Sequence, residues 1–452
     1  MTASERPLAV VILAAGQGSR MKSALPKVLH PIAGRPMIGH VLAVAESLKP
    51  VTIVTVVAPD MQAVEAAVAP HPTAIQSPAL GTAHALLAAA EALRPAVEAG
   101  ADILVLYGDG PLITAESLEV MLAARRGAAP ADFVWLGVRP PDPSGYGRLI
   151  LREGDLRRIV EEREAGDEER AIGLVWGGLL AGDGRRMLEL ASRIDNRNAK
   201  GEYYLTALVE LGLEAGARSV VVETAFDEVR GVNSRAELAA AEAIFQARAR
   251  RRFLEAGVTL IQPDSVTFAW DTEIAADVTV EPYVIFGPGV RIESGAEIRG
   301  FSHLSGVQVG RDAQVGPFAR LRPGSSLGEG VRVGNFVEVK AATLEAGAKA
   351  NHLAYIGDAG VGAGANVGAG TITANYNGVY KSRTEIGTGA SIGSNAVLVA
   401  PVTIGEGALV GAGSVITEDV EADAIATTRA PRKSQPRAAG RYRARLKRER
   451  ER

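Results

Sequence analysis

Short apolar runs alternate with amphipathic, alanine-rich segments through the first half of the chain. The runs are rich in β-branched residues and short enough to be buried strands, and they cover residues 8–13, 51–58, 102–107, 133–138 and 174–180. Between them, segments such as 61–68 and 83–93 have the spacing of amphipathic helices. This alternation predicts an α/β domain on a mostly parallel sheet, in which ligands bind beyond the carboxyl ends of the strands.

The second half shows a different pattern, in which an aliphatic or aromatic residue returns every six positions. Three runs share this spacing: Ile274, Val280, Phe286, Ile292, Ile298 and Leu304; Val309, Val315, Leu321, Leu327, Val333 and Val339; and Ile386, Ile392, Leu398, Ile404, Val410 and Ile416. Hexapeptide parallel β-helices have this period, because each repeat adds one short strand with one inward side chain. The period breaks between Lys340 and Glu385.

Helix-forming residues fill the stretch between these two patterns and predict one linker helix over residues 234–257. Asn233 or Ser234 can cap its start, Glu237 lies in its first turn, and Gly257 follows its end. The predicted organisation is a first domain over 1–233, this helix, a repeat domain over 258–431 and a tail over 432–452.

The tail carries ten Lys or Arg residues against two Glu, together with Pro436 and Gly440. Charge runs of this kind are usually solvated, so we expect a disordered basic extension. Contact with nucleic acid or with a membrane surface stays open as the alternative, although Tyr442 is the only aromatic residue that could support it.

Length and composition narrow the class of protein. A chain of 452 residues is too long for one core, so two or three domains are expected. The net charge of −3 argues against a surface devoted to nucleic acid, and no nucleic-acid partner is expected. The chain has no cysteine, which excludes disulfides and is compatible with a reducing cytoplasm. Because no signal peptide and no apolar run of the ~18 residues needed for a membrane span are found, we expect a cytoplasmic protein without a membrane partner.

Candidate chemistry begins in the loop Leu13-Ala14-Ala15-Gly16-Gln17-Gly18-Ser19-Arg20-Met21, which follows the first predicted strand. Glycines let backbone N–H groups approach an anion, and Arg20 and Lys27 can neutralise it, so this region suits a polyphosphate. The pattern is neither GxGxxG nor GxxxxGK[ST], so neither the dinucleotide fingerprint nor the P-loop applies. An ordinary turn between a strand and a helix is the alternative.

Asp109 lies just after the predicted strand 102–107. A carboxylate there is a suitable Mg²⁺ ligand when phosphates are also bound, because Mg²⁺ prefers hard oxygens and keeps several waters. An Asp-Gly turn is the alternative. Polar residues in other predicted loops, among them Gln76, Glu161 and Asn233, favour a binding site.

His352 lies within the break in the six-residue period, next to Asn351 and close to Tyr355 and Asp358. A histidine titrating near neutral pH can take a proton from an amine as it attacks a thioester. A hydrogen-bonded structural histidine is the alternative, and the surrounding repeat favours catalysis.

The motifs LAAGQGSRM, LPK, LGT, YGD, GYGR, IVE, GEYYLT and GVN occur here in the order found in sugar-phosphate nucleotidylyltransferases, which the first half resembles. Together with the repeats, residues 8–431 resemble the bacterial bifunctional N-acetylglucosamine-1-phosphate uridylyltransferases/glucosamine-1-phosphate acetyltransferases. The resemblance implies a Rossmann-like nucleotidyltransferase domain, a linker helix and a left-handed parallel β-helix. It also implies a homotrimer formed through the β-helix.

By this resemblance, the first domain transfers UMP from UTP to N-acetylglucosamine-1-phosphate with Mg²⁺ and releases pyrophosphate. The residues implied to bind UTP and the UDP-sugar product are Leu13, Ala14, Ala15, Gly16, Lys27, Gln76, Gly81, Thr82, Tyr107, Gly108, Asp109, Gly147, Glu161 and Asn233. Arg20 and Lys27 would hold phosphates, Asp109 and Asn233 the metal, and Gly147 and Glu161 the sugar. Such transfers depend on positioning and charge neutralisation more than on a covalent nucleophile.

The resemblance gives the second domain the acetylation of glucosamine-1-phosphate by acetyl-CoA, with His352 as the base. The remaining residues implied for the acceptor and for acetyl-CoA are Arg322, Lys340, Tyr355, Asn366, Ala369, Asn375, Tyr376, Ser394, Ala412 and Arg429. Arg322 and Lys340 would bind the sugar phosphate.

Three positions in the first domain depart from the family pattern. Trp176 replaces a sugar-contacting asparagine, Ala207 replaces an aspartate, and Gly110 replaces a larger, usually aliphatic residue. Indole has one donor and no acceptor, so Trp176 cannot replace an amide. An acetyltransferase with an inactive or differently specific first domain therefore stays open. A nucleotidyltransferase with a regulatory β-helix is a further alternative, against which His352, Arg322 and Lys340 argue. A non-catalytic assembly subunit would be expected to lack Lys27, Asp109 and His352, and all three are present.

Overall fold

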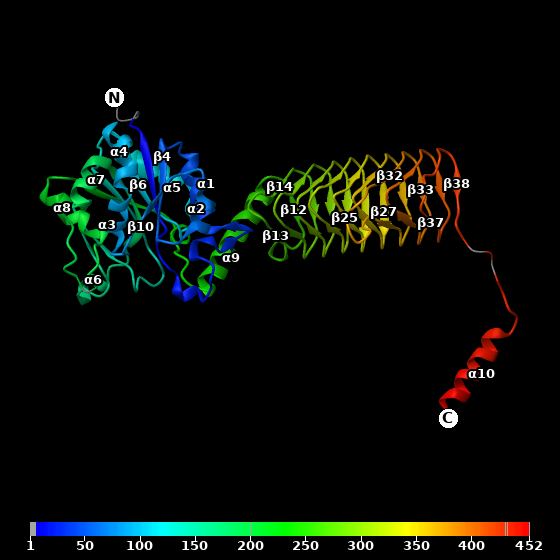
Figure 1. The fold of residues 1–452 in the computed structure, drawn as a ribbon. Coiled ribbons are helices and arrows are strands. Elements are labelled where there is room, and N and C mark those ends of the chain that lie inside the picture. Colours follow the sequence, from blue (N-terminus) through cyan, green and yellow to red (C-terminus); the bar gives the residue numbers. More distant parts are fainter. Residues whose placement is uncertain (1–5, 199, 430, 432, 452) are drawn as a thin grey trace. The chain divides into compact units, whose positions relative to one another are not determined.

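The computed structural model describes residues 6–198, 200–429, 431 and 433–451 (Figure 1). They form two compact units, the first ending at Ala249 and the second beginning at Arg250. No helix among the described residues is long and apolar enough to cross a membrane.

The first unit is built on a mixed sheet with strand order β11-β7-β10-β6-β1-β4-β5. These strands are β1 (Leu8–Leu13), β4 (Thr52–Val57), β5 (Thr73–Ile75), β6 (Asp102–Tyr107), β7 (Phe133–Val138), β10 (Val175–Asp183) and β11 (Ser219–Glu223), with β8 (Arg148–Arg152) and β9 (Asp155–Val160) attached beside β10 and a separate hairpin of β2 (Pro31–Ile32) and β3 (Arg35–Pro36). All neighbours in the main order pair in parallel except β10, which runs antiparallel to β6 and β7. The predicted α/β sheet is confirmed.

Helices cover both faces of this sheet. They are α1 (Met37–Ser47), α2 (Gln62–Val68), α3 (Thr82–Ala88), α4 (Ala90–Glu98), α5 (Ala115–Arg126), α6 (Asp167–Arg170), α7 (Gly184–Ala191) and α8 (Leu208–Glu214). Val11 of β1 belongs to the core shared with α3, α4, α7 and α8, and Val10 belongs to the opposite core with α1, α2 and α5. Because both faces are covered, every residue of β1 is buried, which explains its continuous apolar run.

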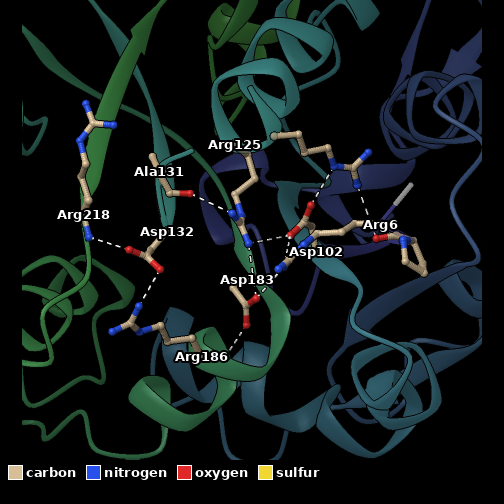
Figure 2. Close-up of polar contacts among 10 residues, drawn as sticks. Arg6, Asp102, Arg125, Ala131, Asp132, Asp183, Arg186 and Arg218 are labelled. Carbon is tan, nitrogen blue, oxygen red and sulfur yellow. Dashed lines mark hydrogen bonds and ion pairs between the residues drawn. The ribbon is translucent and has the colours of Figure 1, made fainter. Parts of the chain in front are cut away.

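An ionic cluster lies at the end of the sheet where β6 begins, opposite the end that carries the carboxyl termini of β1 and β6 (Figure 2). Asp102 is fully buried, and its carboxylate contacts Arg126 at 2.8 Å and Arg125 at 3.1 Å. Asp183 of β10 accepts hydrogen bonds from Arg6 at 2.8 Å and from Arg125 at 3.4 Å. Because charges removed from water need close partners, this cluster ties β6, β10, α5 and the start of β1 together.

The linker helix is present as α9 (Arg235–Glu255). Ser234 Oγ accepts a hydrogen bond from the Glu237 N–H, and the Glu237 carboxylate accepts one from the Asn233 N–H. The predicted boundaries treat this helix as separate, whereas the two compact units divide within it. Its early part packs on the first unit through buried Ala241, and Arg250 donates to the backbone of Val266 in the second.

The second unit is a parallel β-helix with three sheets. The first contains β12 (Thr259–Leu260), β15 (Thr279–Val280), β18 (Glu297–Ile298), β21 (Gln314–Val315), β24 (Arg332–Asn335), β27 (Lys349–His352), β30 (Asn366–Val367), β33 (Ser391–Ile392), β36 (Leu409–Val410) and β38 (Ile425–Ala426). The second contains β13 (Thr267–Phe268), β16 (Ile285–Phe286), β19 (His303–Leu304), β22 (Arg320–Leu321), β25 (Glu338–Lys340), β28 (Tyr355–Gly357), β31 (Ile372–Ala374), β34 (Val397–Val399) and β37 (Val415–Ile416). The third contains β14 (Glu273–Ile274), β17 (Arg291–Ile292), β20 (Val307–Val309), β23 (Ser325–Leu327), β26 (Thr343–Leu344), β29 (Ala359–Val361), β32 (Thr384–Ile386) and β35 (Val402–Ile404).

The predicted break in the repeat between Lys340 and Glu385 is wrong for most of that segment. The coils continue through it with a buried inward side chain in each strand, namely Leu344, Ala350, Ile356, Val361, Val367 and Thr373. The pattern was hidden because Ala350 is small, Thr373 is polar, and some turns are one residue shorter. Strand pairing continues through all three sheets, and a longer loop, residues 375–383, separates β31 from β32.

Exposed aromatic side chains stack along one corner of the β-helix. Tyr283, Phe301, Phe318 and Phe336 have ring centroids 4.9, 5.0 and 5.2 Å apart, and Leu353 occupies the same position in the next coil. We call these five residues the aromatic ladder. Each is 45–60% exposed and has a positive φ, a conformation that is strained for such residues and that the coil geometry imposes.

The tail differs from its prediction. Residues Ala438–Arg450 form helix α10 in place of a disordered extension, and its side chains are exposed apart from half-buried Ala438. The segment is rich in Ala, Arg and Lys, and Arg445 pairs with Glu449 one turn later, both of which favour a helix. Arg432 and Arg452, at the ends of the predicted tail, lie outside the described residues.

Candidate active sites

The loop after β1 emerges at the carboxyl edge of the sheet, as predicted. Gly18 has a φ of +63°, and a Cβ on it would lie 2.5 Å from Cβ of Lys27. Glycine is therefore required for the two segments to pass each other. Gly16 is exposed with open space around it, so its backbone is free to approach a ligand.

A cavity of about 310 Å³ opens beside this loop; we call it the smaller cavity. The predicted residues that line it are Leu13, Ala14, Ala15, Gly16, Lys27, Gln76, Gly81, Thr82, Tyr107 and Asp109. Buried Gln76 donates from Nε2 to the Gly81 carbonyl at 2.9 Å, and Gly81 has a φ of +115° with no room for a Cβ against the Tyr203 backbone. Most predicted nucleotide contacts thus come together.

A second cavity, of about 490 Å³, adjoins the first because Tyr107 and Asp109 line both; we call it the larger cavity. It is also lined by Arg20, Asn233 and Trp176. Tyr107 is half-buried, and the partial removal of its phenol from water raises the pKa and keeps the group neutral.

Lys27, Asp109 and Asn233 meet at the junction of the two cavities. The Lys27 ammonium contacts Asp109 Oδ2 and lies 3.0 Å from Asn233 Oδ1. Both oxygens therefore converge on one positive charge, although Lys27 and Asn233 are 206 positions apart in the sequence. The described residues include no cluster of three or more His, Cys, Asp or Glu side chains that could hold a metal by themselves.

Other predicted residues lie apart from the cavity linings. Gly108 packs behind Ala14, where a Cβ would lie 3.2 Å from the Ala14 Cβ, so it has a packing role. Glu161 accepts from Thr206 Oγ1 at 3.4 Å, and burial raises the pKa of its carboxyl. Gly147 lies against Glu161, and its carbonyl accepts from the Trp176 N–H at 2.8 Å, which places both beside the larger cavity.

In the second unit, His352 ends β27 and lies opposite Asn335 of β24. His352 Nδ1 is 2.7 Å from Asn335 Oδ1, and the ring is exposed. An amide oxygen only accepts, so Nδ1 carries a proton, and in the neutral ring Nε2 then presents a lone pair. The sequence analysis did not select Asn335. Its position one coil before His352 in the repeat is the feature that could have indicated it.

Polar side chains from the next sheet cluster around Asp358. Its carboxylate accepts from Asn375 Nδ2 and from Lys340 Nζ at 3.4 Å, and Asn375 also lies 3.4 Å from the Tyr355 hydroxyl. The Lys340 ammonium lowers the pKa of nearby Lys381, a residue that sequence reasoning missed. Two adjacent cations of this kind suit a bound anion.

Arg322 lies one coil before Lys340 and is paired with Glu338 at 2.8 Å. Its charge also contributes to lowering the pKa of Lys381, which places it near the same cationic cluster. Tyr376 is 60% exposed in the loop after β31, where its hydroxyl donates to the Gly378 carbonyl.

The residues predicted for acetyl-CoA form a column toward the end of the β-helix. The Ala369 carbonyl accepts from the Asn395 N–H, and the Ser394 carbonyl accepts from the Gly413 N–H, so Ala369, Ser394 and Ala412 share one turn of successive coils. Asn366 lies on β30 of the same sheet, with an exposed side chain. Arg429 reaches back toward Gly411.

Two family models match the chain in its two halves. The MobA-like NTP transferase domain matches residues 10–171, and the bacterial transferase hexapeptide model, with six repeats, matches residues 383–418. The first unit is thus a nucleotidyltransferase domain, and the second is a left-handed β-helix of hexapeptide repeats.

Curated relatives match nearly the full length. Bifunctional protein GlmU of Paramagnetospirillum magneticum is 54% identical over 97% of this chain and 97% of its own. The protein of the same name from Rhodospirillum rubrum is 54% identical over 97% and 98%, and that from Jannaschia sp. is 50% identical over 99% and 98%. A solved UDP-glucose pyrophosphorylase bound to UDP-glucose overlays with a TM-score of 0.44 and 16% identity, over 54% of this chain and 99% of that one, a likeness too low to support a statement about function. On the strength of the full-length relatives, the chain belongs to the GlmU family of bifunctional proteins.

Proposed function

We propose that each of the two units catalyses one of the two transfers that yield UDP-N-acetylglucosamine. The second unit acetylates glucosamine-1-phosphate, and the first unit couples the product to UTP. The observation that supports this division is that the residues of each cluster lie within one unit. Lys27, Asp109 and Asn233 converge in the first, and His352 pairs with Asn335 in the second.

In the acetyl transfer, the amine nitrogen of glucosamine-1-phosphate attacks the thioester carbonyl of acetyl-CoA. His352 Nε2 takes the proton that the amine loses, the C–S bond breaks, and coenzyme A leaves as a thiol once it has regained a proton. Arg322, Lys340 and Lys381 bind the sugar phosphate, and Tyr355, Asn366, Asn375 and Tyr376 complete the acceptor site. Ala369, Ser394, Ala412 and Arg429 line the acetyl-CoA site.

In the uridylyl transfer, a phosphate oxygen of N-acetylglucosamine-1-phosphate attacks the α-phosphorus of UTP, and the bond to the departing pyrophosphate breaks. The smaller cavity holds the uracil nucleotide through Leu13 to Gly16, Gln76, Gly81 and Thr82. Arg20 and Lys27 neutralise phosphate charge, while Gly147 and Glu161 contact the sugar. Held in this way, the reacting oxygen and phosphorus need no covalent nucleophile.

Asp109 and Asn233 fit a Mg²⁺ site. Their carboxylate and amide oxygens are hard donors that already converge on one cation, Lys27, and Mg²⁺ in such sites takes one or two protein oxygens together with phosphates and water. When bound, Mg²⁺ neutralises charge on the phosphates.

We also propose a cytoplasmic homotrimer. The absence of cysteine is compatible with a reducing compartment. Support for assembly through the β-helix comes from the aromatic ladder, which exposes a row of apolar side chains that runs to Leu353, next to His352.

Two assays on the purified chain test the proposal. The first follows thiol release from acetyl-CoA with glucosamine-1-phosphate, and the second follows pyrophosphate release from UTP with N-acetylglucosamine-1-phosphate and Mg²⁺. Both signals are expected. Absence of either would show that the corresponding unit does not perform its transfer.

A further inference from the structure

We infer that Trp176 forms an apolar wall of the sugar subsite and relaxes the selectivity of uridylyl transfer among sugar 1-phosphates. The inference rests on the proposed uridylyl transfer and names a property of that site. It starts from the departure at position 176, where the family pattern has a sugar-contacting asparagine.

The indole of Trp176 has no polar group left for a ligand. Its Nε1–H donates to the Leu179 carbonyl at 3.2 Å, within the bulge of β10. The ring packs edge-to-face on Trp135, at 5.6 Å between centroids, and on Tyr107, at 6.4 Å. Because Trp135 is fully buried, the indole is held in place and offers the larger cavity only ring atoms.

Trp176 also lies where a sugar contact is needed. Its backbone N–H donates to the carbonyl of Gly147 at 2.8 Å, and a Cβ on Gly147 would be 3.7 Å from Glu161 Oε1. Gly147 and Glu161 are the proposed sugar contacts, so the indole forms the adjoining wall of the same subsite.

The small residue at position 110, the second departure, offsets the larger volume of Trp176. Gly110 lines the same cavity, and a Cβ added there would meet only the Tyr107 carbonyl oxygen, at 3.6 Å. The resemblance implies bulk at position 110 and an amide at position 176, whereas this chain has space at 110 and bulk at 176. A cavity of about 490 Å³ remains open between them.

The chemical consequence follows from how the two kinds of wall discriminate. A site that hydrogen-bonds a substrate group rejects analogues that lack it by about 10⁴-fold or more, because its own polar group is left unpaired. An apolar wall discriminates small differences by only about 10- to 200-fold. Replacing the amide by an indole therefore lowers selectivity at this side of the sugar.

The test measures kcat/KM for uridylyl transfer from UTP to four acceptors: the 1-phosphates of N-acetylglucosamine, glucose, galactose and mannose. The unmodified chain is expected to use at least one of the last three within about 200-fold of N-acetylglucosamine-1-phosphate, as an apolar wall allows. If all three fall below that limit, the inference is overturned. This measurement needs no variant, so it stands even if a substitution impairs folding.

Variants assign the effect to Trp176. Trp176→Asn is expected to lower the relative use of the alternative sugars at least tenfold, while Trp176→Phe, which keeps an aromatic wall, leaves the ratio within about threefold. An unchanged ratio in Trp176→Asn overturns the role of the indole. Only two other tryptophans are present, so UDP-N-acetylglucosamine is also expected to change the fluorescence of the unmodified chain but not of Trp176→Phe. An equal change in both overturns the contact.

The outcomes also separate this inference from the function on which it rests. Transfer to N-acetylglucosamine-1-phosphate alone overturns relaxed selectivity and leaves uridylyl transfer intact. Absence of transfer to all four acceptors overturns both.

Discussion

His352 and Asn335 lie on neighbouring coils, with Nδ1 of the histidine 2.7 Å from Oδ1 of the asparagine. The strands that carry them pair in register, so the contact is a consequence of the repeat and not of a local motif. It sets the tautomer in which Nε2 can accept a proton.

We predict that Asn335→Ala lowers kcat for acetyl transfer about tenfold or more, with little change in KM, because Asn335 positions the base without touching the substrate. His352→Ala is expected to lose at least about 10²-fold, as for removal of a general base. Both variants should retain uridylyl transfer. A kcat and pH profile unchanged in Asn335→Ala would exclude the positioning role.

Asp109→Ala should give the reverse pattern. Loss of the carboxylate removes a proposed Mg²⁺ ligand and the partner of Lys27, so pyrophosphate release should fall at least about 10²-fold while acetyl transfer is unchanged. Because the same polypeptide performs both reactions, acetyl transfer serves as the internal control. Raising the Mg²⁺ concentration should recover part of the lost activity in Asp109→Asn, which keeps one oxygen donor.

The Asp102 cluster should be a main source of stability in the first unit. Asp102→Ala leaves buried Arg125 with one acidic partner fewer, and breaking such a buried pair costs about 3–5 kcal/mol. The matched control is Glu223→Ala, which removes the exposed pair with Arg139 and should change stability by less than about 1 kcal/mol. Thermal unfolding of the full chain, followed by tryptophan fluorescence, compares the two; equal shifts in midpoint would argue against this role.

Glu161 should make stability depend on pH in a defined direction. Burial raises the pKa of its carboxyl in the folded state above the ordinary value of 4.5, so ionisation opposes folding. This penalty is fully present above the folded-state pKa, decreases as the pH falls toward 4.5, and is absent below it. The stability of the unmodified chain relative to Glu161→Gln is therefore expected to rise from pH 7 toward pH 4.5. A difference that does not vary with pH would contradict the assignment.

The aromatic ladder should be the contact surface of the proposed trimer. Phe318→Asp places a charge among stacked apolar rings, so sedimentation should show smaller species and acetyl transfer should fall, while uridylyl transfer persists. Gln308→Asp, on a different sheet of the same coils, is the control and should leave the assembly unchanged. A Phe318→Asp chain of unchanged size would place the interface elsewhere.

The sequence by itself determined the two architectures and most of the candidate residues. Continuous apolar runs such as Leu8–Leu13 mark strands buried on both faces, and a six-residue period has one structural solution, so local patterns were sufficient for both folds. The loops after β1 and β6 could be chosen because ligands in such sheets bind at the carboxyl ends of the strands.

Only the tertiary structure decided which residues meet. Asn233 reaches Lys27 because the chain returns past the carboxyl edge of the sheet, and Asn335 reaches His352 because one coil of the β-helix separates them. The same holds for Trp176, whose Nε1–H donates to the Leu179 carbonyl and whose ring packs on Trp135. The sequence pattern did not reveal that the coils continue through Ala350 and Thr373. A small or polar residue can fill an inward position when neighbouring coils supply the packing, so an inward position is not always marked by a large apolar residue. Hydrophobic periodicity is a local property of the chain, whereas hydrogen bonds and charge pairs between distant segments exist only once the fold has brought them together.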